Sequence, residues 1–414
     1  MAFVMSPSGP VALDFRVYSW SDQVAEAYGS ATSYNHYLDL SADQLTDPAT
    51  IWRTQRSVRT VVGFLARNIA QVSLHAFARK PDGDRDRVSA AHPLSRTLRS
   101  PSPTLGSYEL IESIVIDMCI YNRFAAVKAL SDDGERMELV RMPPELFQFK
   151  RDKLKRPLSL VTIDGKTEIQ LEDLLWIDGY PGDEVPIASL VGLLTEEYQS
   201  SKYRRDLWDG GARIPGWIER PIEAPEWSRL ARDKFRSGWR AYASGGASVG
   251  KTPILEDGMK YHSANTVTPE QGQQIEARKL AVSEVAAAYF VPPVFVGVLD
   301  NANYSNVTAY REILYSDTLG PWFAKLGQAF QSRLVPDFDD PDLFVEFNVG
   351  EKLRMSFDDQ ARIFQTATGG PFMTRNEARR RLNLPQVEGA DELIVPLNVI
   401  EGGQASPTDA DSTT

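Results

Sequence analysis

The sequence contains little cysteine and histidine and has no long hydrophobic run. Cys119 is the only cysteine among 414 residues, which excludes an intramolecular disulfide and fits a reducing compartment. The four histidines (His36, His75, His92 and His262) stand far apart without the spacing of a zinc site, so we expect no metal. No stretch of about 18 apolar residues occurs, and no membrane-spanning segment is therefore expected.

The sequence also lacks an excess of basic residues. Asp and Glu number 56 against 45 Lys and Arg, which gives a formal net charge of −11. Proteins that bind nucleic acid tightly normally carry a basic face that neutralises phosphates. Any contact of this chain with DNA is therefore expected to be local and weak. The first residues, MAFVMSPSGPVALDF, have no positive region and no continuous apolar stretch, so no secretory signal is expected there.

Hydrophobic spacing predicts a chain of α+β class with more than one structural unit. Apolar residues recur every three or four positions from Ser57 to Val72 and from about Ser107 to Tyr121, which predicts two helices. The strand-like LHAFAR lies between them, and short strand-like runs follow between residues 124 and 177. This order differs from the regular βαβ alternation of a nucleotide-binding sheet. Residues 1–50 have few apolar residues in register and are expected to form a poorly ordered arm.

The middle of the chain is predicted to be mostly helical. One helix is expected from Ser189 to Trp208 and another from the capping box of Thr268 and Gln271 to the residues before Pro292. The segment between them contains the strand-like PGWIER, an aromatic helix and TPILEDGMKY, whose Asp-Gly turn predicts a hairpin.

A further helix is expected from about Asn306 to Leu334. It should kink at Gly320-Pro321, because proline removes a backbone donor. The last residues, EGGQASPTDADSTT, have the composition of a disordered tail.

The segment GGASVGKT (245–252) matches both the phosphate-binding loop of nucleotide hydrolases and the G-x-S-x-G elbow of serine hydrolases. Both motifs need a strand before the loop and a helix after it. Here a predicted helix precedes the loop and Pro253 follows it, and no histidine follows His262 to complete a triad. We therefore expect a connecting loop without catalytic residues or a bound cofactor.

Eight short segments follow one another in order over roughly residues 55–400. They are HPLSRTL (92–98), IYNRFAAV (120–127), EDLLWIDGY (172–180), WDGGARIPGWIE (208–219), VGKTPILEDGMKYHSAN (249–265), EARKLAVSEVAAAYFVPPVFVGV (276–298), YSNVTAYREILYSDTLGPW (304–322) and TRNEARRRLNLPQVEGAD (374–391). In this order they resemble the portal, or head–tail connector, proteins of long-tailed bacteriophages. The pair Asn122-Arg123 departs from the family's usual Gly-Asn turn, and the residues before Ser57 match nothing in the family.

The resemblance implies a ring of identical subunits, usually twelve, at one capsid vertex, with double-stranded DNA passing through its centre. Each subunit would combine an α/β wing, a helical stem, a small α/β clip and a mostly helical crown. The implied parts are an N-terminal arm, partly disordered (1–55), the wing (56–188), a stem helix (189–209), the clip (210–267), a second stem helix and its exit (268–298), a tunnel loop (299–306), a kinked helix returning to the wing (307–354), the crown (355–400) and a disordered tail (401–414).

Three sets of candidate functional residues follow from the resemblance. The tunnel loop would contact DNA through Asp300, Asn301, Asn303, Tyr304, Ser305 and Asn306. Basic residues of the stem would make transient phosphate contacts or pair between subunits: Lys202, Arg204, Arg205, Arg278 and Lys279. Aromatic residues of the clip would serve as interface anchors or as core: Trp217, Trp227 and Trp239.

The implied partners are other copies of the chain, double-stranded DNA bound without sequence preference, the terminase large subunit, a head–tail adaptor, and the major capsid and scaffold proteins. No membrane partner is expected. The protein would reside at the portal vertex of the virion, and in the host cytoplasm during assembly. Two alternatives stay open: a nucleotide hydrolase that uses Lys251 and Thr252, and a capsid adaptor or scaffold that forms no channel.

Overall fold

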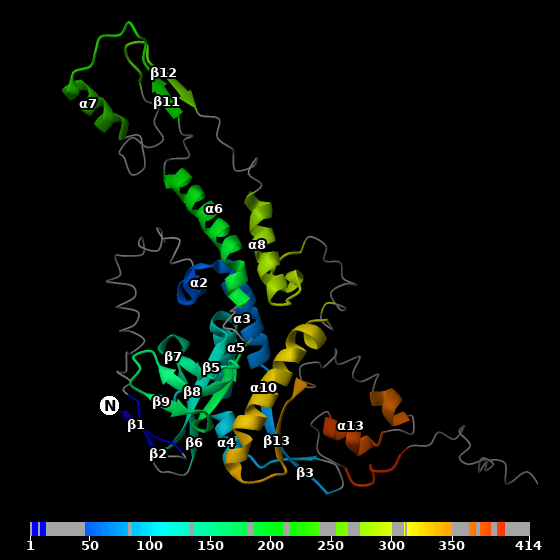
Figure 1. Cartoon of the computed structure of the whole chain (residues 1–414). Helices are drawn as coiled ribbons and strands as arrows, with labels where there is room; N and C mark the ends of the chain where they lie inside the picture. The colour runs from blue at the N-terminus through cyan, green and yellow to red at the C-terminus, as the bar shows by residue number, and fades with distance from the viewer. Residues whose placement is uncertain are drawn as a thin grey trace, which may run out of the picture. The chain divides into compact units, whose positions relative to one another are not determined.

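The computed structural model describes residues 2–6, 9–13, 46–81, 85–131, 136–179, 186–209, 216–240, 254–263, 274–299, 310, 313–349, 364–369, 373–381 and 387–393. The chain divides into two compact units, Met1–Phe347 and Asn348–Thr414 (Figure 1). All the elements from β1 to β13 belong to the first unit.

Three helices at the start of the chain pack together: α2 (Pro48–Thr54), α3 (Arg56–Ala70) and α5 (Ser107–Tyr121). The apolar stripe of α3 is fully buried, as its spacing predicts. The predicted helix from Ser107 to Tyr121 is confirmed at both ends. Cys119 lies in this core with 1% exposure, and burial raises the pKa of its thiol.

The expectation of a poorly ordered arm is wrong for two segments. Strands β1 (Ala2–Ser6) and β2 (Gly9–Leu13) form an antiparallel hairpin. Helix α2 begins at a side-chain cap, where Asp47 accepts a hydrogen bond of 2.8 Å from the backbone of Thr50, and its Ile51 is fully buried. Because Ile51 is the one buried residue of this short helix, its sequence shows no repeating apolar pattern that would predict a helix. Residues 14–45 of the expected arm lie outside the described residues.

Every strand pair in the described part of the chain is antiparallel, which agrees with the predicted α+β class. The strand β5 (Arg123–Leu130), buried at six consecutive positions, lies between β6 (Met137–Met142) and β10 (Leu174–Asp178). Two further sheets join β7 (Phe147–Arg151), β8 (Pro157–Thr162) and β9 (Glu168–Gln170), and β4 (Arg85–Arg87), β3 (Leu74–Arg79) and β13 (Leu343–Phe347). Fully buried Phe147 and Leu174 belong to one apolar cluster shared by the β5 and β7 sheets.

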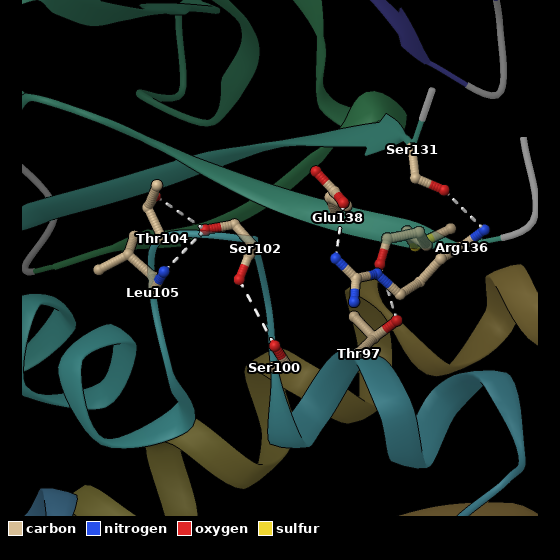
Figure 2. A network of polar contacts seen from close by, with 9 residues as sticks. Thr97, Ser100, Ser102, Thr104, Leu105, Ser131, Arg136 and Glu138 are labelled. Carbon is tan, nitrogen blue, oxygen red and sulfur yellow. Dashed lines mark hydrogen bonds and ion pairs between the residues drawn. The ribbon is translucent and has the colours of Figure 1, made fainter. Parts of the chain in front are cut away.

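A hydroxyl-rich network ties α4 (Pro93–Arg99) and the loop after it to β6 (Figure 2). Thr97 donates through Oγ1 to the carbonyl of Met137 at 2.8 Å. The Ser102 hydroxyl accepts from the backbone N–H of Leu105 at 3.1 Å, and Arg136 pairs with Glu138 at 2.7 Å. These bonds satisfy polar groups beside the core, which gives the network a structural role.

Two helices predicted by the sequence pack against each other: α6 (Val191–Asp209), preceded by the 3₁₀ turn η5 (Pro186–Leu190), and α8 (Gln274–Ala288) (Figure 1). Helix α8 also contacts α3. The predicted capping residues Thr268 and Gln271 lie outside the described residues. Helix α8 ends at Ala288. Two residues later Phe290 has a left-handed φ of 56°, and the 3₁₀ turn η6 (Pro293–Val296) follows.

Between these helices lie β11 (Gly216–Glu219), α7 (Arg229–Arg240) and β12 (Lys260–Ser263). The hairpin predicted around Asp257-Gly258 is wrong. Those two residues do form a turn with positive φ, but β12 pairs with β11 instead, and residues 254–256 form no strand. The local sequence shows a turn without showing which distant strand completes the pair.

The predicted interruption at Gly320-Pro321 takes the form of a change of helix type. A π-helical segment, η7 (Leu314–Leu319), runs directly into α10 (Gly320–Arg333), so the chain remains helical through Pro321. After α10 the 3₁₀ turn η8 (Val335–Phe338) leads into β13. Arg333 anchors α10: its guanidinium lies 3.6 Å from the Trp176 ring and donates to the Trp176 carbonyl at 2.6 Å.

The second unit contains α13 (Arg375–Arg381), which starts with a reciprocal capping box. The Thr374 backbone donates to Glu377 at 2.8 Å, and the Glu377 backbone donates to Thr374 at 3.1 Å. Buried Asn376 holds the returning chain through two side-chain bonds of 2.9 Å to the backbone of Val387.

Candidate functional site

A cleft of about 660 Å³ opens between the α2–α3 junction, α6 and α8. Cations dominate its charged lining: Arg53, Arg56, Arg204, Arg205 and Arg278. Glu197 is the carboxylate among the lining residues, and it accepts a hydrogen bond of 2.6 Å from Ser57. The cleft therefore presents a strongly positive, partly enclosed surface within an acidic chain.

Helix geometry explains how these residues meet. Glu197, Ser201 and Arg205 are spaced four residues apart on α6, so they lie on one face of that helix. Arg278 and Val282 are also four residues apart and share one face of α8. Gln55 connects α2 to α3 and has an extended backbone. Arg53, near the end of α2, and Arg56, at the start of α3, both line the cleft.

The electrostatics of the cleft are unfavourable in the isolated chain. Burial, together with the nearby charge of Arg278, lowers the pKa of Arg204, and Glu197 opposes this shift. Arg204 donates to the Ser201 hydroxyl at 2.9 Å. Within the described residues neither Arg204 nor Arg278 contacts a carboxylate.

A buried amide completes the cleft. Gln55 lines it with only 3% exposure, and its Nε2 has no hydrogen-bond acceptor among the described residues. Buried polar groups almost always have a partner, so an acceptor placed in the cleft would satisfy this donor.

The structure brings together three of the five basic residues singled out from the sequence, namely Arg204, Arg205 and Arg278. Lys202 is half-buried and Lys279 exposed, and neither lines the cleft. Sequence reasoning missed Arg53, Gln55 and Arg56. No local pattern marks them, because their place in the cleft depends on packing between distant helices.

The three predicted tryptophans take part in two sets of ring contacts, one on the β11–β12 pair and one between α7, the loop before it and β12, and we call the two sets together the aromatic cluster of β11, α7 and β12. Trp227 and Trp239 pack on either side of Phe235, with ring centroids 4.8 and 5.9 Å away. Trp217 is 58% exposed and stacks on His262 at 5.4 Å, because the two residues are partners in the β11–β12 register. Tryptophan is enriched at binding surfaces because its side chain offers a large apolar area with a polar edge.

Sequence reasoning missed several members of this cluster. The ring centroids of Tyr261 and Trp239 lie 6.1 Å apart, and the Arg220 Cζ atom lies 4.7 Å from the centroid of the Trp227 ring. Trp227 and Trp239 are half-buried and Trp217 is exposed, so none of the three tryptophans is fully buried. Their exposed apolar area is available to a partner.

Two groups of predicted residues lie outside the described residues. These are the tunnel loop, with Asp300, Asn301, Asn303, Tyr304, Ser305 and Asn306, and the segment GGASVGKT (245–252).

Elsewhere, buried charges are paired within the chain. Asp117 accepts two bonds from Arg141, at 2.8 and 2.6 Å, and burial raises the Asp117 pKa to about 6 although Arg141 acts in the opposite direction. Lys128, 3% exposed, pairs with Asp337 at 2.7 Å. Across the described ranges no three His, Cys, Asp or Glu side chains are grouped to hold a metal, and no helix there is long and apolar enough to span a membrane.

Comparison with known proteins decides between the alternatives. The profile of the family described as "Phage portal protein" matches residues 56–383, which is most of the chain. The chain belongs to the phage portal protein family. The portal family is structural and not enzymatic, so the alternative of a nucleotide hydrolase acting through Lys251 and Thr252 is set aside.

Individual portal proteins show the same relationship. The portal protein of Enterobacteria phage HK97 is 23% identical over 372 residues, covering 87% of this chain and 84% of that protein. A probable portal protein of Streptomyces phage phiC31 is 26% identical over 242 residues, covering 56% and 52% of the two chains.

Solved structures confirm the portal fold. A chain in the neck of a native gene transfer agent particle, computed with C12 symmetry, aligns with a TM-score of 0.56 at 17% identity, covering 82% of this chain and 94% of that one. An HK97-family phage portal protein from Corynebacterium diphtheriae aligns with a TM-score of 0.52 at 15% identity, covering 75% and 97%. The predicted mixed α+β portal fold is therefore confirmed.

Proposed function

We propose that the chain assembles into a closed ring at one vertex of a phage capsid and forms the channel through which double-stranded DNA is packaged and ejected. The observation that carries this proposal is the family match across residues 56–383. Twelve subunits are the expected number, because the similar neck of the gene transfer agent particle was computed with C12 symmetry.

In this proposal each part of the chain takes the place that the resemblance implies. Helices α6 and α8 belong to the stem, residues 210–267 to the clip and residues 355–400 to the crown. The packing of α6 on α8 supports the assignment of the stem. The separate β11–β12 pair with α7, inserted between those helices in the sequence, supports that of the clip.

The net charge of −11 suits a conduit. A channel wall that neutralised many phosphates would hold DNA and slow its movement. Neutral amides and hydroxyls of the tunnel loop, residues 299–306, can contact a moving duplex without fixing its register. Among the stem cations, exposed Lys279 remains a candidate for transient phosphate contact.

The aromatic cluster of β11, α7 and β12 is the proposed docking surface for the terminase large subunit and later for a head–tail adaptor. Its exposed Trp217, with half-buried Trp227 and Trp239, offers apolar area of the kind that binding hot spots use. Major capsid and scaffold proteins would surround the ring at the portal vertex.

The experiment that tests this function is a measurement of particle mass by mass photometry, with negative-stain images of the same sample. Closed rings with a central hole support a channel. Particles that stay monomeric at every concentration contradict the proposal, and defined oligomers without a hole favour an adaptor or scaffold that forms no channel.

A further inference from the structure

Among the described residues, the arginine-lined cleft holds one buried donor without an acceptor and two arginines without a carboxylate partner. Arg278 lies close enough to Arg204 that its charge helps to lower the Arg204 pKa, and neither arginine contacts a carboxylate in the described part of the chain. The buried Nε2 of Gln55 lacks an acceptor in the same place. An unsatisfied donor beside like charges is unfavourable, so an anionic group that the described residues do not supply would stabilise this cleft.

The shape of the cleft favours a carboxylate side chain over a DNA phosphate. A duplex is a broad convex rod, and a phosphate on its surface cannot enter a cleft of about 660 Å³ far enough to meet an amide that is 3% exposed. A single Asp or Glu side chain is narrow enough to reach Gln55 while it pairs with a guanidinium.

The opposite face of α8 carries the matching groups. Glu276, Leu280 and Glu284 follow at four-residue steps and are all exposed, with Leu280 at 56%. Two residues correspond to about 200° round a helix, so Leu280 lies nearly opposite the Arg278 and Val282 face that lines the cleft. Neither glutamate has an ion pair or hydrogen bond within the described residues.

This stripe of Glu276, Leu280 and Glu284 complements the cleft in both charge and apolarity. Two carboxylates flank an exposed leucine, and the cleft combines arginines with Val282 and Val296. Because the two surfaces lie on opposite sides of one helix, identical copies can be joined head to tail, which is the interface type that generates rings.

We propose that the cleft of one copy receives the Glu276–Leu280–Glu284 stripe of its neighbour. Glu276 or Glu284 pairs with Arg204 and Arg278, and one carboxylate oxygen accepts the Gln55 amide hydrogen. This inference rests on the proposed ring and names the surfaces that close it.

Reciprocal charge reversal tests the proposal. Arg204→Glu with Arg278→Glu reverses the cleft, and Glu276→Arg with Glu284→Arg reverses the stripe. Alone, each double variant places like charges in every interface, and we expect its ring population at fixed concentration to fall by at least about tenfold. Mixed in equal amounts, the two variants present opposite charges at every contact of an alternating ring, and rings should return with equal numbers of each.

Lys153→Glu with Lys155→Glu is the matched control for the cleft variant, because it also turns two cations into carboxylates, at exposed positions in the β7–β8 turn. Its rings should match the wild type. Circular dichroism of each variant monitors folding, and the mixing experiment adds an internal check, because two misfolded chains cannot restore one another's rings.

The outcomes separate this inference from the proposed function. Wild-type rings that persist in both reversed variants overturn the inference and leave the portal function intact. Rings that persist in the cleft variant while DNA retention falls assign the cleft to phosphate instead. Loss without rescue on mixing also contradicts the pairing, whereas wild-type protein that never forms rings overturns the proposed function itself.

Discussion

The sheet core around β5 and the cleft between α6 and α8 differ in whether their charged side chains have partners of opposite charge. In the core, Asp117 and Lys128 are almost fully buried, and each has a partner of opposite charge within the same chain. In the cleft, Arg204 and Arg278 share a surface with a buried amide that has no acceptor among the described residues. The core is complete in one subunit, whereas the cleft has the properties of half an interface.

The largest expected effect on stability comes from breaking a pair in the core. Lys128→Met removes the cation that holds Asp337 at 2.7 Å and the Glu172 carbonyl at 2.8 Å. The free energy of unfolding should fall by about 3–5 kcal/mol, because the partners are left without compensation. Denaturant titration measures the loss, and Lys153→Met at an exposed position should change stability by less than about 0.5 kcal/mol.

Asp117 should make the stability of the core depend on pH. Burial raises its pKa from 3.8 to about 6, so folding takes up a proton between these values. Its contribution is therefore fully present below about pH 4 and is lost as pH rises to about 6, by up to about 3 kcal/mol. Asp117→Asn should remove this slope.

Stability measured at each pH for wild type and Asp117→Asn gives the contribution of this one group by difference. Glu226→Gln, an exposed carboxyl, serves as the control and should leave the slope unchanged. A difference between wild type and Asp117→Asn that stays constant from pH 4 to 7 would contradict the assignment.

The aromatic cluster of β11, α7 and β12 should contribute little to the stability of one subunit. Trp239→Ala removes a half-buried ring that contacts Phe235 and Tyr261, and we expect a loss of about 1 kcal/mol. Fully buried Phe124→Ala should cost about 3–5 kcal/mol by comparison. Thermal unfolding of both variants decides the point, and equal losses would show that the cluster is a second core.

The smallest effect on a single subunit is expected at Gln55. Gln55→Leu removes a buried donor without an acceptor, so the monomer should be unchanged or more stable by up to about 1 kcal/mol. The same substitution should weaken ring assembly, which mass photometry measures by dilution. A less stable monomer with unaltered rings would place the role of Gln55 in folding.

Local patterns in the sequence predicted much of this core. The period of α3, the ends of α5 and the runs that become β5, β6, β7, β8 and β10 are all local, and each appears where the residues indicate. The β11–β12 pair was missed because strand pairing depends on distant register. The cleft was missed in part for a related reason: Arg53 and Gln55 meet Arg204 and Arg278 only after helices from separate regions pack.

A cryo-electron microscopy map of the assembled ring would show which surfaces meet between neighbouring copies. We expect a carboxylate of Glu276 or Glu284 within about 4 Å of Arg204 or Arg278 of the adjacent subunit, with the Gln55 amide bonded to it. A ring in which this cleft is empty, or faces the channel with DNA phosphate beside it, would contradict the claim that the neighbouring copy completes it.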